Sequence, residues 1–211
     1  MWSKDPYLRS DIVASAMSRN KFEKIKSNLK FYKPEVAENT KDRAWRVRSM
    51  LNIFRKNLVQ FGIFSTAVSI DEMMTTFYGR CVMKQFIKAK PIRFGIKMWA
   101  LCSASGFLFD FDIYCGKNSD KGEVLTNCAL GSRVVLQMLQ KLLFNIPAKK
   151  LFKYHVYYDN LFCCPDLLVH LKKAGLRATG TVRENRIKEK NDISKDTPRG
   201  TFAVKHDKNS V

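Results

Sequence analysis

The spacing of apolar residues changes once along this chain, near residue 67, and that change limits the folds open to it. Before this point apolar side chains recur at helical spacing, as at Phe22, Ile25 and Leu29, with lysines between them. After it, short β-rich runs alternate with helical stretches. The 211 residues are enough for one sizeable core, or for one domain with an appendage.

The expected elements can be read from these periods and from their Gly and Pro boundaries. Two basic helices are predicted in 18–32 and 44–62, ahead of the change in spacing. From Ala67 onward we predict the order β-β-β-α-β-α-β, with strands in 66–74, 94–102, 107–114, 155–158 and 176–185, a hairpin turn in 103–106, and helices in 131–147 and 164–175. A hairpin followed by strands that alternate with helices indicates an α/β protein, a mixed sheet with helices on its faces.

Two acidic residues, Asp110 and Asp112, lie inside the second strand of the predicted hairpin. They alternate with Phe107, Phe109, Phe111 and Ile113, so the acids and the apolar residues are expected on opposite faces. We predict that Asp110 and Asp112 face solvent and are not metal ligands.

Two other carboxylates, Asp71 and Asp159, each follow a β-rich run directly. Sites in open α/β sheets cluster at the carboxyl ends of strands. Two acids brought together there would repel unless a divalent metal lay between them, and Mg²⁺ favours such oxygen ligands. One hypothesis is therefore a metal site for phosphodiester cleavage. The other is that both acids only cap strands or form turns, since Asp159-Asn160 suits a turn.

The charge balance is far from neutral, with 38 Lys and Arg against 19 Asp and Glu, a formal net charge of +19. Such an excess favours polyanionic partners. No apolar stretch approaches the roughly 20 residues that span a bilayer, and the N-terminus lacks the apolar core of a signal peptide. We therefore predict DNA or RNA as the partner before a membrane surface. A basic surface that only maintains solubility is the alternative.

The six cysteines form no C-x-x-C pair, and no His stands at zinc-finger spacing from them. Without a secretory signal they are interpreted as reduced thiols in a cytosolic or nuclear protein. A zinc site within the chain is not expected.

Three segments carry motifs that can be compared with known families. They are SIDEMMTTFYGRC (69–81), KAKPIRFGIKMW (88–99) and YYDNLFCCPDLLVHLKKAGLRATGTVRENR (157–186). In this order, and after SKDPYL and MSRNKFEKIKSNLKFY near the N-terminus, they resemble the piggyBac transposases and the proteins derived from them. The resemblance extends over nearly the whole chain.

The resemblance implies an RNase H-like catalytic fold and a metal-dependent DDD transposase. Asp71 and Asp159 would be the first two catalytic acids and would hold Mg²⁺ or Mn²⁺ in the complete site. Arg80, Lys90 and Lys97 are expected to contact DNA phosphates. DNA would be the partner, with a homodimer in the full-length family, a nuclear location, and neither a membrane nor a small-molecule substrate.

The same resemblance predicts a division into three parts: a helical dimerisation and DNA-binding region (1–66), the first part of the catalytic core (67–186) and the start of an inserted domain (187–211). The family's third aspartate lies further downstream. The remaining candidates here, Asp192, Asp196 and Asp207, lie in polar sequence that does not read as strand or helix starts. We therefore expect a truncated chain that does not cleave DNA alone. The alternatives are a non-catalytic DNA-binding protein, domesticated or decaying, and a transposon remnant.

Overall fold

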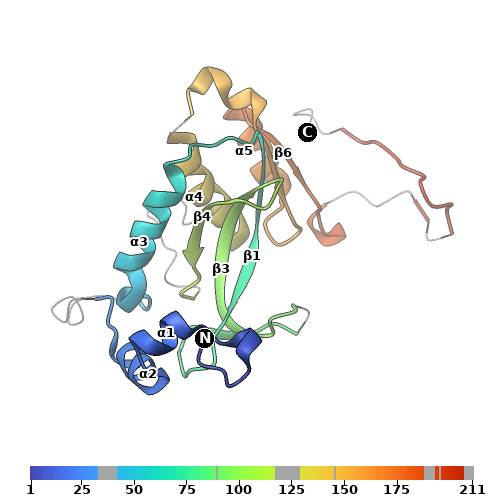
Figure 1. The fold of residues 1–211 in the computed structure, drawn as a ribbon. Helices are drawn as coiled ribbons and strands as arrows, with labels where there is room; N and C mark the ends of the chain where they lie inside the picture. Colours follow the sequence, from blue (N-terminus) through green and yellow to red (C-terminus); the bar gives the residue numbers. More distant parts are fainter. Residues whose placement is uncertain are drawn as a thin grey trace.

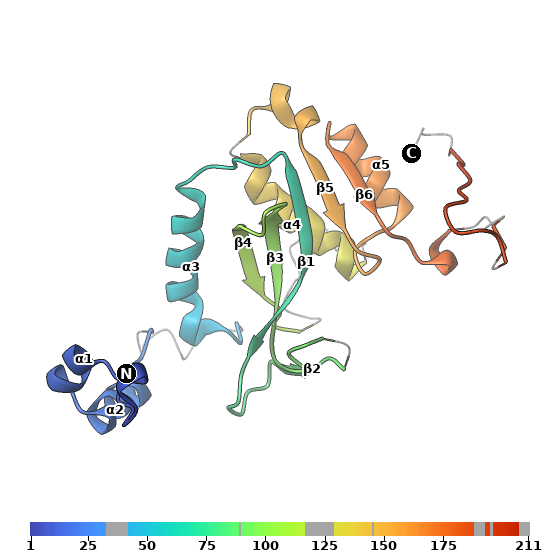
Figure 2. The ribbon, with the colours of Figure 1, turned by 45° about the vertical axis from the view of Figure 1, so that its right-hand side comes forward.

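A computed structural model of the chain describes residues 1–32, 42–88, 90–116, 129–144, 146–187, 193–194 and 196–206. Within these residues six strands form one mixed sheet in the order β2-β3-β1-β5-β6, with β4 pairing with β3 (Figures 1 and 2). The strands are β1 (Ala67–Thr76), β2 (Lys84–Phe86), β3 (Phe94–Ser103), β4 (Leu108–Ile113), β5 (His155–Tyr158) and β6 (Arg177–Gly180). The predicted α/β class is confirmed.

The predicted strand order is wrong by one short strand, because β2 adds a fourth strand before the first core helix. β2 has only three residues and pairs antiparallel with Phe94 to Ile96 at the start of β3. A strand this short between basic residues has no detectable period of two, so only its pairing with β3 reveals it.

The four predicted helices are present as α2, α3, α4 and α5, with ends that differ by a few residues, whereas α1 was not predicted. The α-helices are α1 (Asp11–Ala16), α2 (Arg19–Asn28), α3 (Trp45–Val59), α4 (Leu130–Phe144) and α5 (Pro165–Lys173). Short 3-10 turns occupy η1 (Pro6–Leu8), η4 (Ala148–Lys153) and η5 (Glu184–Arg186). α5 begins with Pro165 at its first position and carries Lys172 and Lys173 in its last turn, as helix-end preferences predict.

Helices α4 and α5 pack on one face of the sheet and form the larger core. The sheet contributes Val68, Ile70, Trp99, Leu101, Val156 and Tyr158, and the helices contribute Val134, Val135, Met138, Leu139, Leu167 and Leu171. β1, β5 and β6 run parallel, so α4 and α5 act as the crossovers that lead into β5 and β6.

Helix α3 lies along β4 and supports a second, smaller core (Figures 1 and 2). This core contains Ala44, Met98, Phe111, Ile113 and Cys115, with Val47, Leu51 and Leu58 packed against it. Met98 and Trp99 are successive residues of β3 in different cores, which shows that the two cores lie on opposite faces of the sheet.

The predicted faces of the β3–β4 hairpin are wrong in two respects. Leu101 pairs with Asp110 and Cys102 with Leu108, so Phe109 is an extra residue in a bulge. Phe109 therefore packs in the larger core, whereas Phe111 and Ile113 pack in the smaller one. Asp110 is buried and Asp112 half-buried, because arginines of α3 cover both acids.

Candidate functional site: a carboxylate pair beside the parallel strands

Asp71 and Asp159 are brought together by the parallel pairing of β1 with β5. The described ladder ends at Ile70 opposite Tyr158, and the two aspartates are the next residue on each strand. Side chains alternate along both strands, so the two carboxylates lie on the same face and at the same end of this ladder. This juxtaposition agrees with the predicted meeting of the two acids.

The sequence had indicated that Asp71 ends its strand, and this prediction is wrong. β1 runs on to Thr76, because β3 pairs with it from Val68 to Thr76. Asp71 instead marks the point where β1 loses β5 as a neighbour. The carboxylate therefore sits on backbone that is held by hydrogen bonds to β3 on its other side.

Both carboxylates are exposed, so burial does not oblige either acid to bind a metal. β5 is only half-buried: Val156 and Tyr158 enter the core, whereas Tyr157 is exposed on the other face. Asp159 Oδ1 accepts a hydrogen bond from Leu161 N at 2.8 Å, and Asp71 Oδ1 accepts one from Glu72 N at 2.7 Å. Neither Oδ2 accepts a hydrogen bond from a described residue.

The turn after Asp159 is held by two arginines that the pattern of acids in the sequence does not indicate. Arg186 donates from Nη1 to the carbonyl oxygens of Asn160 at 2.6 Å and Cys163 at 2.7 Å. Arg183 Nε donates to Asn160 Oδ1 at 3.1 Å. Both arginines belong to the TGTVRENR run, so the motif could have drawn attention to them. That they hold the turn after Asp159 is visible only in the tertiary structure.

A cluster of polar and aromatic side chains lies on the same sheet face as the two carboxylates. The His155 and Tyr157 rings stack with centroids 4.3 Å apart, and His155 Nε2 lies 2.7 Å from Thr179 Oγ1. Partial burial and the positive charge of Arg177 lower the pKa of His155. Burial, and then the negative charge of Asp71, raise the pKa of Cys102 on the neighbouring strand.

The donor set of the pair suits a hard divalent cation. Two carboxylates without nitrogen or sulfur ligands are typical of Mg²⁺ or Mn²⁺ and not of zinc. Glu72, the next residue, faces the opposite side of the sheet and forms an ion pair with Lys97 at 2.6 Å. Among the described residues, no three His, Cys, Asp or Glu side chains form a group that could hold a metal.

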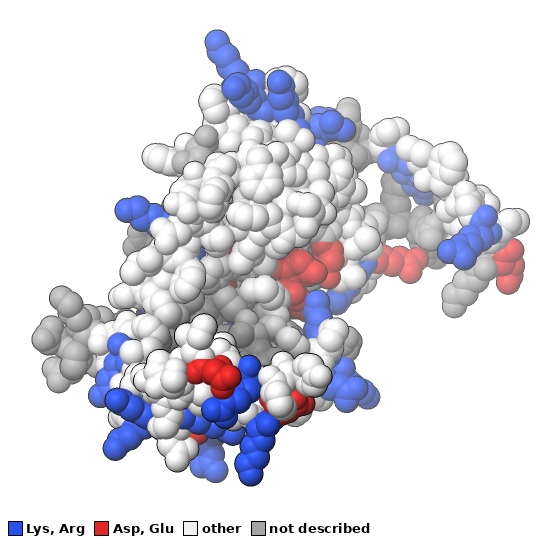
Figure 3. Space-filling view, in the orientation of Figure 1, with Lys and Arg blue, Asp and Glu red and all other residues white. Residues whose placement is uncertain are grey.

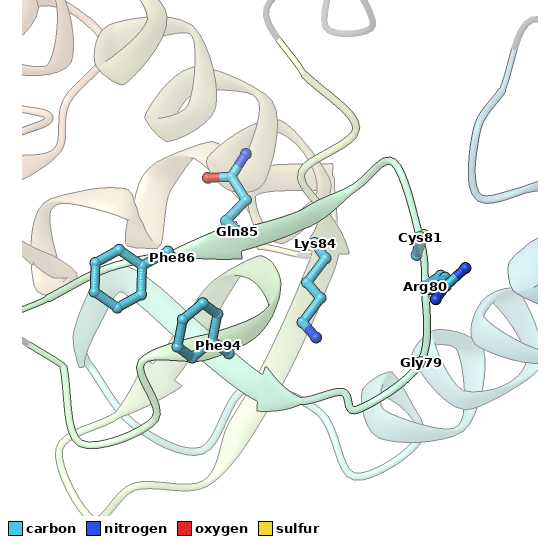
Figure 4. Close-up of a pocket in the computed structure, with 7 residues that line it drawn as sticks. All are labelled: Gly79, Arg80, Cys81, Lys84, Gln85, Phe86 and Phe94. Atoms are coloured by element: carbon cyan, nitrogen blue, oxygen red, sulfur yellow. The ribbon is translucent and has the colours of Figure 1, made fainter.

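The three predicted phosphate contacts occupy different environments. Lys97 is largely buried, with Nζ in its ion pair with Glu72 and 4.3 Å from the Trp99 ring centroid. Lys90 Nζ lies 3.7 Å from Glu72 and is half-buried. Arg80 is exposed and lines an open groove beside β2 (Figure 4). Among the described residues Arg80 has no ion-pair partner, whereas Lys90 and Lys97 both pair with Glu72. All three phosphate contacts stay predictions.

Comparison with known proteins gives one consistent family. The sequence profile described as Transposase IS4 matches residues 1–211. The human piggyBac transposable element-derived protein 3 is 33% identical over 214 residues, which cover 98% of this chain and 34% of that protein. The human piggyBac transposable element-derived protein 2 is 29% identical, with 98% and 34% covered. The chain thus spans about a third of the length of these curated relatives.

A solved structure shows the same fold. The cryo-EM structure of a piggyBac transposase synaptic complex with hairpin DNA superposes with a TM-score of 0.71 at 24% identity, over 92% of this chain and 40% of that one. In the part of the chain that the structure describes, no helix is long and apolar enough to cross a membrane. The chain belongs to the Transposase IS4 family, and within it to the piggyBac transposases and piggyBac-derived proteins.

Proposed function

We propose that this chain forms the part of an RNase H-like DDD transposase core that supplies its first two metal-binding carboxylates, Asp71 and Asp159. The observation that carries the proposal is their register: each is the next residue after the last described β1–β5 pair, on one exposed face. The strand order, with helices α4 and α5 as parallel crossovers, supports the fold. On this basis 67–186 is the core segment, between a helical region at 1–66 and a further segment at 187–211.

The chemistry of the site follows from the two carboxylates and the DNA that they would face. Mg²⁺ or Mn²⁺ held by Asp71 and Asp159 would stabilise charge on the phosphate during strand cleavage and transfer. The chain's own contribution is to hold Asp159 still through Arg186 and the Leu161 amide. Because both acids are exposed, a DNA backbone can reach them without a rearrangement of the core.

DNA is the proposed partner, bound through its backbone. The net charge of +19 supports this, and Figure 3 shows Lys and Arg gathered at the lower and upper ends of the molecule in that view. We also propose a homodimer and a nuclear location. Exposed apolar side chains on α2 and α3, and at the C-cap of α2, support self-association: Phe22, Ile25, Leu29, Ile53 and Phe54.

The second candidate is a DNA-binding protein without catalysis, domesticated from a transposase. The similarity to two human proteins described as transposable element-derived favours it. Nicking of supercoiled plasmid separates the candidates. Metal-dependent nicking by the 211-residue chain that Asp71→Asn abolishes would support the enzyme. DNA binding without nicking would support the second candidate.

Manganese binding tests the carboxylate pair directly. The free Mn²⁺ signal in electron paramagnetic resonance is titrated with wild type, Asp71→Asn, Asp159→Asn and the control Asp196→Asn. Asp196 is exposed and forms no ion pair with any described residue. We expect each site variant to weaken binding about tenfold or more, since each removes a charged oxygen ligand. Equal binding by all four proteins would refute the site.

A further inference from the structure

The hairpin that follows Asp71's strand has a composition that the carboxylate site does not explain. We call residues 77–94 the basic hairpin; it contains β2 and reaches the first residue of β3. It holds five cations and no acid: Arg80, Lys84, Lys88, Lys90 and Arg93. In Figure 2 it extends beyond the helices that cover the sheet. Its charge alone fits a polyanion.

An exposed aromatic pair lies at the centre of the basic hairpin. Phe86 and Phe94 are cross-strand partners with ring centroids 4.6 Å apart, and they are 56% and 57% exposed. Lys84 Nζ lies 5.8 Å from the Phe94 ring centroid. Both rings line the open groove with Arg80, Lys84 and Gln85, as Figure 4 shows. Apolar surface of this kind, rimmed by cations, is typical of a binding site.

We propose that the basic hairpin binds an unpaired stretch of DNA, with a base stacked on the Phe86–Phe94 pair and phosphates beside Arg80 and Lys84. Exposed aromatic rings in a cationic groove are how proteins hold single strands without reading their sequence. A paired duplex conceals its base faces, so the aromatic rings favour unpaired DNA. The inference rests on the proposed function, because it takes DNA as the ligand. It adds that the bound DNA is unpaired and that the basic hairpin binds it.

The hairpin is close enough to the carboxylates to hold the same strand. Thr76, the last residue of β1, is five residues beyond Asp71, or about 17 Å along the strand. At the ~3.4 Å per nucleotide of a duplex strand this distance corresponds to about five nucleotides, and an unpaired, more extended strand would span it with fewer. DNA with a phosphate at Asp71 and Asp159 would therefore meet the basic hairpin within a few nucleotides of that phosphate.

Binding of a fluorescent oligothymidine, followed by anisotropy, tests the proposal. The affinities of wild type, Phe86→Leu and Phe94→Leu are compared, with covalently closed duplex circles as the competitor that has no unpaired ends. Phe152→Leu is the matched control. Phe152 is 61% exposed and its ring centroid lies 6.0 Å from Lys153 Nζ, but it belongs to η4 and not to the basic hairpin. Phe86→Tyr keeps the ring and tests rescue.

The leucine variants are expected to lose about 5- to 100-fold in oligothymidine affinity, the range of one base–aromatic stack. Their duplex affinity stays unchanged, and Phe152→Leu and Phe86→Tyr bind as wild type. Unchanged oligothymidine binding by both leucine variants overturns the proposal, as does an equal loss with Phe152→Leu. Concentration-dependent sedimentation that Phe86→Leu abolishes, without an effect on DNA, would assign the surface to a second copy instead.

The same proteins separate this inference from the carboxylate site. If Asp71→Asn loses Mn²⁺ binding and Phe86→Leu binds oligothymidine normally, only the proposed DNA site on the basic hairpin is refuted. If Asp71→Asn binds Mn²⁺ normally and Phe86→Leu loses oligothymidine binding, only the carboxylate site is refuted, because Phe86→Leu leaves Asp71 and Asp159 untouched.

Discussion

At the scale of single residues, a bidentate and largely buried ion pair joins α3 to the edge strand β4. Arg55 donates from Nε to Asp110 Oδ1 at 2.6 Å and from Nη2 to Oδ2 at 2.8 Å. Only 15% of the Arg55 side chain and 9% of the Asp110 side chain are exposed. A bidentate pair with little water around it stabilises the fold mainly because either charge alone would be costly to bury.

Replacement of Arg55 by Met tests this pair. We expect the free energy of unfolding to fall by about 3–5 kcal/mol, because Asp110 is left buried without its main partner. Urea denaturation measures the change, with Arg46→Met on the exposed side of α3 as the control. The double variant Arg55→Met/Asp110→Leu should recover part of the loss. An equal effect of Arg46→Met would show that the pair is not responsible.

Asp42 gives the fold a dependence on pH. Its hydrogen bonds and ion pair with Arg48, at 2.6 Å, hold the pKa of the Asp42 carboxyl below its usual value of about 3.9. A lowered folded pKa contributes stability that is present above the unfolded value and is lost as the pH falls through the folded pKa.

In Asp42→Asn, the free energy of unfolding should therefore vary less with pH below about 4 than in the wild type. Thermal melts across pH 2–6 measure the difference. We expect it to be about 1 kcal/mol or less, the usual contribution of one partly exposed ion pair. Asp196→Asn, whose carboxylate has no ion pair with a described residue, should follow the wild-type curve. Parallel curves for wild type and Asp42→Asn would contradict the assignment.

At the scale of elements, α4 begins against the turn that carries Asp159. A Cβ added at Gly131 would lie 2.3 Å from Leu161 O and 2.7 Å from Phe162 Cα, both in the backbone of that turn. The helix start and the turn can therefore approach this closely only with glycine at 131. The position of Asp159 thus depends on helix packing as well as on β5.

Gly131→Ala should displace this turn. We expect a loss of about 1–3 kcal/mol in the free energy of unfolding, from overpacking against backbone, together with weaker Mn²⁺ binding. Gly106→Ala is the control, since Gly106 has φ +86° and no atom within 4 Å of an added Cβ. It should lower stability through its backbone conformation and leave Mn²⁺ binding unchanged. A Gly131→Ala protein with normal Mn²⁺ binding would show that the turn tolerates the shift.

At the scale of the whole molecule, the net charge of +19 predicts how the chain would associate with DNA under the proposed function. The affinity should be weak, independent of sequence and strongly dependent on salt, because each phosphate contact releases counterions. The logarithm of the binding constant for duplex DNA should fall by ~0.9 per contact for each tenfold rise in salt.

Arg80→Gln should reduce that slope by about 0.9, whereas Lys149→Gln on η4, away from the basic hairpin, should leave it unchanged. Anisotropy titrations of duplex DNA at several salt concentrations provide the slopes. An affinity that salt does not change would refute backbone binding altogether.

Much of this protein could be predicted from the sequence, because its signals are local. The period of the apolar residues predicted every α-helix but α1 and every strand but β2, and Pro165 and Gly175 bounded α5. The motifs identified the family and pointed to Asp71 and Asp159, whose role stays a prediction. Such features depend on residues within a few positions of one another, so single-chain patterns record them.

Only the tertiary structure decided what depends on pairing between distant segments. The β1–β5 register set Asp71 beside Asp159, the bulge at Phe109 divided the apolar residues of β4 between two cores, and α3 converted Asp110 from an expected surface acid into a buried partner of Arg55. Register and helix docking are chosen by the summed packing of many side chains from separate segments, and no local pattern contains that sum.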